Sequence, residues 1–319
     1  MKLNHFTNVL RSLSKLTNNQ IHILQHRINN EINKGGTNLL IDKCKGGDTV
    51  CPHCGSESIG KWGSSCGLQR YRCKTESCHK TFNALTKTPL ARLRKRHLWQ
   101  ANLDCMFDTL PLWRVAEELK IATSTAFRWR HRFLKAPSND KPSEVAGIIE
   151  ADEMIFLESY KGNQTIHNRP ARKRGGLGDK RCKNDKIPVL IIKDRSGGLT
   201  DCVLESQSKA EIHGVLTPIV NVESVLCTDG ASAYKTFAKE RGIKHYRNIT
   251  PQGARVIKRT YHIQNVNNYM SRLRAWMAPF HGVGTAYLAN YLGWMRMMEK
   301  RKRLALDELL HSNYRRCAI

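Results

Sequence analysis

Residues 147–155 read GIIEADEMI, and this stretch decides the fold of the larger part of the chain. Its apolar ends and polar centre predict a strand, with Glu150 and Asp152 on one face and Glu153 on the other. Residues 187–193 (IPVLIIK) form a continuous apolar run. Such a run is typical of a strand buried on both faces, so the two stretches predict the start of a central sheet.

The elements that follow extend this sheet. A Ser-Gly-Gly turn leads into a third predicted strand at 199–204, residues 208–220 predict a helix, and residues 224–228 predict another buried strand. Helices are expected from there onwards. The order predicts an α/β domain over residues 144–300.

An acidic residue follows the last of these strands directly. Asp229 stands at the carboxyl end of strand 224–228, and sites in α/β sheets lie at such strand ends. Phosphodiester chemistry with Mg²⁺ needs oxygen ligands that converge from separate strands. Asp152 and Asp229 are therefore a candidate pair of metal ligands. On these residues alone, roles as a helix cap or an ion-pair partner are the stronger alternative.

The charge of the whole chain predicts a polyanionic partner. The 319 residues include 53 Lys and Arg but only 27 Asp and Glu, which gives a net charge of +26. Such an excess favours nucleic acid as the partner. No apolar run approaches the roughly 18 residues that a membrane-spanning helix needs, and the first residues lack the core of a signal peptide. We therefore expect a cytoplasmic protein that binds nucleic acid and no membrane.

Four cysteines have the spacing of a zinc site. A CxxC pair and a CxxxxC pair, joined by about one short hairpin, predict a tetrahedral structural Zn²⁺ site of the ribbon type. The four ligands are Cys51, Cys54, Cys73 and Cys78. Because the second pair is wider than usual, Cys66 and His79 are alternative ligands. The other cysteines are scattered singly, which favours a reducing compartment over a disulfide framework.

A helix-turn-helix is predicted after the cysteine cluster. Residues 114–120 form a short amphipathic helix, residues 121–124 a turn, and residues 125–134 a second helix with one aromatic and one basic face. Arg128 and Arg132 on the basic face are candidates to contact DNA phosphates or guanine edges. The alternative is an ordinary surface helix with a solvated basic face.

Composition also indicates where the chain divides. The predicted parts are a helical leader at 1–44, a zinc ribbon at 45–90, the helix-turn-helix region at 91–136, a linker at 137–143, the α/β domain at 144–300 and a basic tail at 301–319. Residues 168–186 form a basic, glycine-containing loop. Within this loop, Arg172, Lys173 and Arg174 are candidate contacts to DNA phosphates.

Several motifs occur together in one order and resemble a known family. They are CPHCGS, YRC with SCHKTFNALTKTPL, STAFRWRHRF, EADEMIF, CTDGASAY, and HIQNVNNYMSRLRAW with FHGVGTAYLANYLGW. This set, spanning roughly residues 45–298, resembles bacterial insertion-sequence transposases of the DDE class with an N-terminal zinc ribbon. The resemblance implies an RNase H-like mixed sheet with flanking helices. It also implies Mg²⁺ or Mn²⁺ as the catalytic cofactor, and the first two catalytic aspartates at Asp152 and Asp229.

The third catalytic position departs from the common pattern of this family. Most members carry a glutamate where this chain has Asn267, and the resemblance places a basic partner at Arg274. Seven residues are nearly two helical turns, so Asn267 and Arg274 are expected on one helix face. An amide oxygen can ligate Mg²⁺, and an arginine can hold a DNA phosphate bidentately.

The function expected from these observations is that of a transposase. It would bind insertion-sequence ends as a dimer or larger assembly, and would catalyse metal-dependent DNA cleavage and strand transfer. One alternative is a catalytically inactive or domesticated DNA-binding regulator, which has no need of two converging aspartates. Another is a structure-selective nuclease on the same fold, which would cleave strands without joining them.

Overall fold

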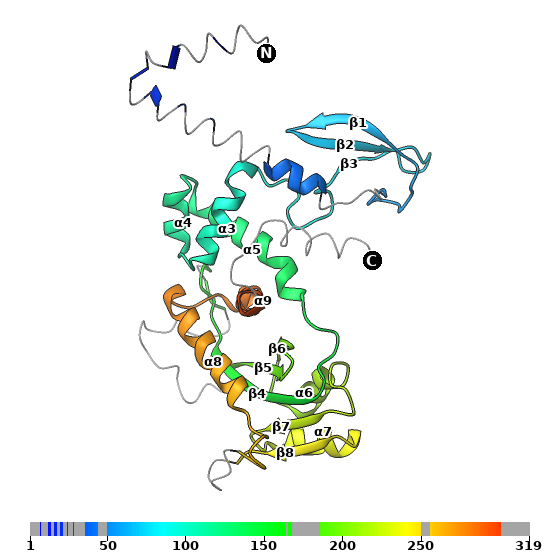
Figure 1. Cartoon of the computed structure of the whole chain (residues 1–319), viewed down its shortest axis with the longest axis vertical. Coiled ribbons are helices and arrows are strands. Elements are labelled where there is room, and N and C mark those ends of the chain that lie inside the picture. Colours follow the sequence, from blue (N-terminus) through cyan, green and yellow to red (C-terminus); the bar gives the residue numbers. More distant parts are fainter. Residues whose placement is uncertain are drawn as a thin grey trace. The chain divides into compact units, whose positions relative to one another are not determined.

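The computed structural model describes residues 36–43, 50–163, 165–167, 186–249 and 256–300, together with a few isolated positions before residue 36. The chain divides into two compact units (Figure 1). Residues 1–136 with 303–319 make up the first unit, and residues 137–302 make up the second.

Some predicted features lie outside the described residues. They are most of the helical leader at 1–44, the basic loop with Arg172, Lys173 and Arg174, and the basic tail at 301–319.

A small antiparallel sheet forms one part of the first unit. β1 (Ile59–Ser65), β2 (Leu68–Cys73) and β3 (Thr81–Asn83) pair in the order β1-β2-β3. Its buried cluster contains Cys51, Cys73 and Phe82. Because this cluster buries little apolar surface, it contributes only weakly to folding. This part of the chain therefore needs a further source of stability.

Helices form the other part of the first unit. They are η1 (Arg96–Leu98), α3 (Trp99–Phe107), α4 (Leu112–Glu118) and α5 (Thr123–Asn139). Trp99 of α3 and Phe133 of α5 meet edge to face, with ring centroids 5.4 Å apart, and both are buried. This aromatic pair fixes α5 against α3.

α5 is longer than the sequence predicts at both ends. It begins at Thr123 rather than Thr125 and continues to Asn139, through the first half of the stretch predicted as a linker at 137–143. The last turn contains Pro137, and both Pro137 and Ser138 are buried. Packing of this turn thus overrides the loop-like composition on which the linker prediction relied.

The second unit contains a mixed five-stranded sheet. Its strands are β4 (Ile148–Leu157), β5 (Lys186–Asp194), β6 (Leu199–Val203), β7 (Val225–Thr228) and β8 (Lys244–Arg247), in the order β6-β5-β4-β7-β8. β4 and β6 flank β5 antiparallel, whereas β7 runs parallel to β4 and to β8. The predicted mixed α/β sheet is confirmed.

One strand of this sheet was not predicted. Helices were expected throughout after Asp229, but β8 pairs with β7 as an edge strand. Its four residues, KHYR, include three that are polar, so neither an apolar run nor a clear alternation indicates a strand.

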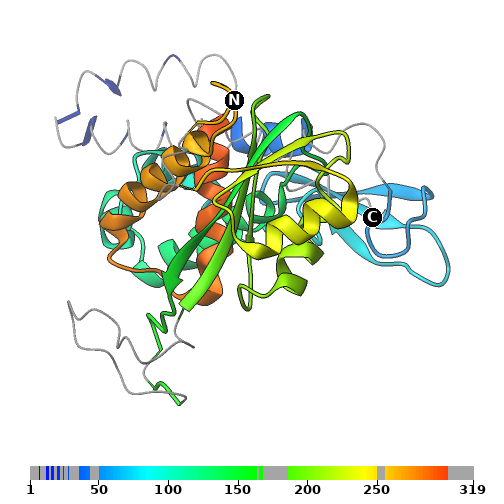
Figure 2. The ribbon, with the colours of Figure 1, turned by 90° about the horizontal axis from the view of Figure 1, so that it is seen from below.

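Two helix layers cover the sheet (Figure 2). The period-two alternation of β5 sends Leu190 and Ile192 towards α6 (Lys209–Leu216) and α7 (Ser232–Arg241). Val189 and Ile191 pack instead against α8 (Gln264–Met277) and α9 (Leu288–Lys300). The short 3-10 helices η4 (Ala278–Phe280) and η5 (Thr285–Tyr287) connect α8 to α9.

Within the described parts of the chain, no helix is both long and apolar enough to span a membrane.

Candidate active site and zinc centre

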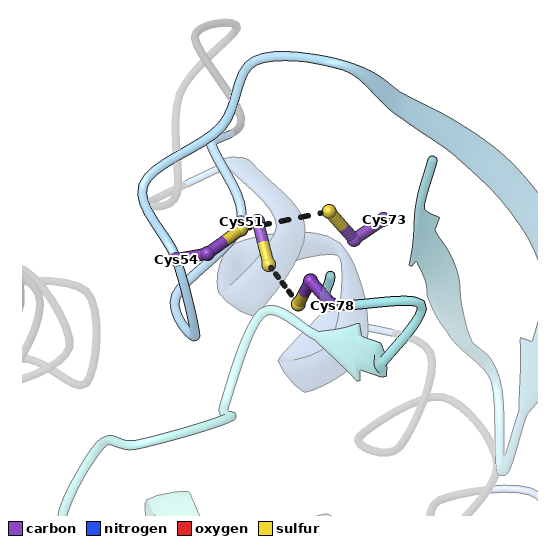
Figure 3. Close-up of side chains that lie close together, drawn as sticks. All are labelled: Cys51, Cys54, Cys73 and Cys78. Carbon is purple, nitrogen blue, oxygen red and sulfur yellow. Dashed lines mark hydrogen bonds between the residues drawn. The ribbon is translucent and has the colours of Figure 1, made fainter. Parts of the chain in front are cut away.

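Four cysteine thiols meet in the first unit (Figure 3). Cys51 and Cys54 lie before β1, Cys73 ends β2, and Cys78 lies before β3. All four sulfur atoms are within 4.8 Å of one another. The Sγ–Sγ distance is 3.8 Å between Cys51 and Cys78, and 3.6 Å between Cys54 and Cys73.

This arrangement fits a tetrahedral zinc ion. A Zn–S bond of about 2.3 Å places the sulfur atoms of such a site about 3.8 Å apart. Hydrogen bonding from Thr75 lowers the pKa of the Cys73 thiol to about 7, which favours the thiolate that binds metal. Neither Cys66 nor His79 belongs to the group of candidate ligands found among the described residues. The geometry therefore supports Cys51, Cys54, Cys73 and Cys78 as the ligand set for a structural zinc ion.

α4 and α5 are two consecutive helices joined by a short turn, as the predicted helix-turn-helix requires. The turn between them contains Lys120 in the left-handed region at φ 49°, and the Ile121 N–H donates to the Ala116 carbonyl at 3.0 Å. On α5, the predicted apolar face is buried through Ala126, Trp129 and Phe133.

The two arginines proposed for DNA contact differ in their surroundings. Arg128 is exposed on α5. The Arg132 guanidinium donates from Nε to the Pro89 carbonyl, and from Nη2 to the Ala91 carbonyl at 2.8 Å. Arg132 thereby ties α5 to the segment before η1, and Arg128 is the one whose guanidinium faces solvent.

In the second unit, strand pairing aligns the two candidate aspartates. β4 and β7 are parallel neighbours, with Ile148 opposite Val225 and Glu150 opposite Cys227. Continuing this register by two residues sets Asp152 beside Asp229. Neighbouring strands lie about 4.8 Å apart, so the two carboxylates leave the sheet at adjacent points.

The electrostatics of Asp152 reflect this closeness. Burial is the main reason that the pKa of the Asp152 carboxyl rises from 3.8 to about 6, and the Asp229 charge raises it further. Two other interactions act in the opposite direction and lower the pKa of Asp152. They are a hydrogen bond of 2.8 Å from the Glu153 N–H and the positive charge of Arg274. Two neighbouring carboxylates repel each other when both are ionised, and a divalent cation bound between them would offset this repulsion.

The loop after β7 holds Asp229 in place. Its Oδ1 accepts the Ala231 N–H at 3.0 Å, and Gly230 adopts φ 103°, a conformation that favours glycine. A Cβ on Gly230 would also lie 2.9 Å from Cγ1 of Ile249. This glycine therefore permits the tight turn that carries Asp229.

α8 carries the third candidate position, Asn267, and its basic partner Arg274. The first turn of α8 contacts Glu150, and Arg274 farther along lines a cavity of about 350 Å³ with Met154 and other residues at the end of β4. α8 therefore runs along β4 in the same direction. Asn267 is exposed and lies on α8 between these two points.

Comparison with known proteins identifies the second unit, because residues 144–299 match the ISXO2-like transposase domain family. We call this unit the transposase domain after the family that it matches. An uncharacterized protein in transposable element ISH50 of Halobacterium salinarum is 26% identical over 247 residues, covering 76% of this chain and 82% of that protein. The chain as a whole thus resembles insertion-sequence transposases.

Solved structures give weaker similarities. A pre-cleavage Mos1 transpososome is 12% identical, with a TM-score of 0.24 over 69% of this chain and 78% of that chain. A Mos1 transposase paired-end complex with the left transposon end is 14% identical, with a TM-score of 0.23 over 69% and 76%. TM-scores this low assign no residue of the transposase domain.

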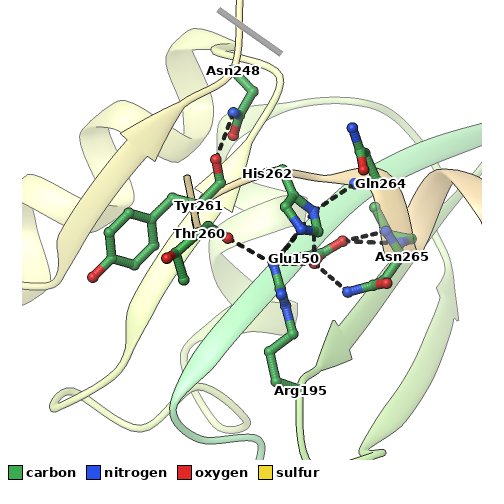
Figure 4. A network of polar contacts seen from close by, with 9 residues as sticks. Glu150, Arg195, Asn248, Thr260, Tyr261, His262, Gln264 and Asn265 are labelled. Carbon is green, nitrogen blue, oxygen red and sulfur yellow. Dashed lines mark hydrogen bonds and ion pairs between the residues drawn. The ribbon is translucent and has the colours of Figure 1, made fainter. Parts of the chain in front are cut away.

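The transposase domain also contains a buried polar network that sequence reasoning missed (Figure 4). At its centre is Glu150, which is 0% exposed. Its carboxylate pairs with Arg195 at 2.9 Å and accepts hydrogen bonds from the first turn of α8. The available signal was a charged residue on the buried face of β4, two positions before Asp152.

Proposed function

We propose that this chain is an active transposase that cuts DNA at the ends of its insertion sequence and joins the freed ends to a target. Asp152 and Asp229 would hold Mg²⁺ or Mn²⁺. The observation that supports this proposal is the β4–β7 register, which, continued by two residues, puts Asp152 in the middle of β4 beside Asp229, the residue directly after β7. When bound, the divalent ions stabilise charge on the attacking and leaving oxygens of the phosphodiester.

The residues around the pair have distinct roles in this proposal. Asn267 serves as a neutral metal ligand or positions a water molecule, and Arg274 holds a DNA phosphate next to Asp152. The coupling of the Arg274 charge to Asp152 supports this assignment. An arginine is suited to it because its guanidinium binds phosphate oxygens bidentately.

The remainder of the chain supplies DNA affinity. The helix-turn-helix with the exposed Arg128, and the loop with Arg172, Lys173 and Arg174, would bind the element ends, and two or more chains would assemble on them. The net charge of +26 supports strong electrostatic binding to DNA.

Strand cleavage and strand transfer with duplexes that carry the element's own ends test the proposal. Asp152→Ala and Asp229→Ala should each reduce both reactions to background while DNA binding persists. Glu153→Gln is the matched control, since Glu153 accepts a hydrogen bond from the Tyr234 hydroxyl at 2.6 Å, and a glutamine retains an acceptor for that bond. Cleavage by Asp229→Ala at the wild-type rate would refute the proposed metal site.

The third position needs its own comparison. If the amide is a tuned part of the site, Asn267→Ala and Arg274→Ala should both lose activity. If it is instead a decayed glutamate, the parent should be nearly inactive, and Asn267→Glu should restore cleavage because a third carboxylate strengthens cation binding.

A further inference from the structure

α8 has no capping residue of its own. Residue Ile263 stands at its N-cap position and offers no side-chain hydrogen bond. The first-turn N–H groups of a helix have no partner within the helix and must find one elsewhere. In this helix most of the partners come from a distant part of the chain.

Glu150 supplies most of them. Its Oε2 accepts the Asn265 N–H at 2.8 Å and the Val266 N–H at 3.0 Å, while His262 Nδ1 accepts the Gln264 N–H at 3.2 Å. The Asn267 N–H then begins the helical pattern by donating to the Ile263 carbonyl at 3.1 Å. The first turn of α8 is thus completely satisfied, chiefly by a residue of β4.

The other carboxylate oxygen of Glu150, Oε1, also has two partners. Oε1 accepts from the Asn265 side-chain amide at 2.8 Å and pairs with Arg195 Nη2 at 2.9 Å. Arg195 Nη2 also donates to the Thr260 carbonyl at 3.1 Å, so the arginine joins the segment before α8 to the same carboxylate. His262 Nδ1 already accepts a hydrogen bond, so Arg195 is the cation that neutralises Glu150.

Apolar packing alone does not fix where α8 lies along the sheet. Val266, Met270 and Leu273 pack on the apolar face of β4 and β5. Such packing is non-directional, whereas hydrogen bonds from a buried carboxylate to two successive N–H groups define both the position and the rotation of the helix.

We infer that Glu150 is a positioning residue, which fixes the place of α8 along β4 and thereby the places of Asn267 and Arg274 relative to Asp152. Glu150 and Asp152 share one face of β4, two residues apart, so one strand holds a metal-binding aspartate and the anchor of the helix that completes the site. This inference rests on the proposed function for its catalytic meaning. The mechanical link between β4 and α8 is independent of that function.

The chemistry of the network supplies a sharp test. The groups closest to Glu150 Oε1 are two donors, the Asn265 side-chain amide and Arg195 Nη2, so in Glu150→Gln an NH₂ group at that position meets them donor against donor. Adding Asn265→Asp reverses that contact: the glutamine NH₂ can donate to the new carboxylate, which also pairs with Arg195. The double variant should therefore restore what the single variant loses.

The experiment compares these variants in the full chain by two readouts. Hydrogen exchange at the first turn of α8 is measured without DNA, and Mn²⁺ binding is followed by electron paramagnetic resonance alongside cleavage. Asp201→Asn is the matched control, because it breaks another buried ion pair of the same unit, with Arg296 of α9, away from the first turn of α8.

We expect Glu150→Gln to speed exchange in the first turn of α8 by about tenfold or more, because the Asn265 amide and the Arg195 charge lose their acceptor and the anchor of the helix is weakened. Mn²⁺ binding and cleavage should weaken together, and the double variant should recover both to within about twofold of the wild type. Asp201→Asn should lower Tm without changing either readout at α8. If Glu150→Gln unfolds the chain, recovery in the double variant still decides the question.

Two outcomes would overturn the inference. One is a Glu150→Gln variant that changes exchange and Mn²⁺ binding no more than Asp201→Asn does. The other is a double variant no better than the single one. If the wild type does not cleave at all, the proposed function fails, but the exchange measurement still decides whether Glu150 anchors α8.

Discussion

At the scale of single residues, the fold gives Asp152 the surroundings that the proposed cation site requires. Its carboxyl is part-buried, beside Asp229 and within the field of Arg274. Burial and the negative charge of Asp229 disfavour ionisation of the Asp152 carboxyl, whereas the positive charge of Arg274 favours it. The result is a carboxyl whose pKa, about 6, lies within the range in which it can exchange a proton for a metal ion.

The titration of Asp152 yields a prediction. A proton competes with the metal, so Mn²⁺ affinity should fall about tenfold per pH unit below pH 6. Because the folded-state pKa is raised, this group makes the metal-free protein more stable as the pH falls from 6 towards 3.8. Asp229→Asn should lower the pKa of Asp152 only in part, since burial is the larger cause, and Arg274→Ala should raise it. Carboxyl-carbon NMR titration measures both, and shifts of the same sign would contradict this account.

Arg128 and Arg132 provide a second prediction at this scale. Arg128→Ala should weaken binding to an element-end duplex without lowering Tm, since its side chain is exposed. Arg132→Ala should reduce the free energy of unfolding by about 1.5–3 kcal/mol, because its charged hydrogen bonds to Pro89 and Ala91 are lost. Fluorescence anisotropy and thermal unfolding separate the two effects. Unchanged DNA affinity in Arg128→Ala would remove Arg128 from the interface.

At the scale of elements, close packing of α9 explains why part of the predicted linker is helical. Arg296 of α9 pairs with the buried Asp201 and donates to the Pro137 and Ser138 carbonyls, the latter two at 2.8 and 3.2 Å. One turn earlier, Gly293 lies against the same backbone. The end of α5 is therefore stabilised by contacts with α9, which cannot be predicted from the residues of α5 alone.

Replacing two helical glycines by alanine should change the free energy of unfolding in opposite directions. Gly293 lies in this contact, and Gly214 serves as the uncrowded comparison. A Cβ on Gly293 would lie 2.5 Å from Cα of Ser138, so Gly293→Ala should destabilise the domain by about 1–3 kcal/mol despite the better helix propensity of alanine. Gly214 of α6 has no heavy atom within 4 Å of such a Cβ, so Gly214→Ala should stabilise by up to about 1 kcal/mol. Urea unfolding measures both. A stabilising Gly293→Ala would show that α9 does not pack closely on this turn.

At the scale of the whole molecule, the chain consists of two units with different sources of stability. The transposase domain has two apolar clusters, one on each face of its sheet. The ribbon of the first unit has a far smaller cluster, which includes the cysteines themselves. In such a module, the metal supplies much of the free energy of folding.

Removal of zinc should therefore act on one unit alone. Cys51→Ser, or treatment with a chelator, should abolish the ribbon's contribution to folding and weaken DNA binding, while the transposase domain unfolds at its original temperature. Calorimetry with zinc analysis of the full chain checks this, and Cys66→Ser is the control because Cys66 lies outside the candidate ligand group. A chain without bound zinc, or a loss of both units in Cys51→Ser, would contradict the prediction.

The sequence by itself determined what depends on local patterns. Period-two alternation placed Glu150 and Asp152 on one face of β4, and the buried strands before Asp229 and around residues 187–193 followed from their apolar runs. Cysteine spacing alone predicted the four thiols that the structure brings together. These features are visible in sequence because each arises from residues a few positions apart.

Only the tertiary structure decided what depends on distant partners. β8 forms because β7 offers it an edge, and the last turn of α5 is helical because α9 covers it. Arg132 and Arg128 look alike in sequence, but only Arg132 finds backbone carbonyls to bind. Glu150 reads as one more acid beside Asp152, yet it caps a helix that begins more than a hundred residues later. A hydrogen-bond acceptor can satisfy any donor that the fold brings to it, so its partner is set by topology and not by neighbours in the chain.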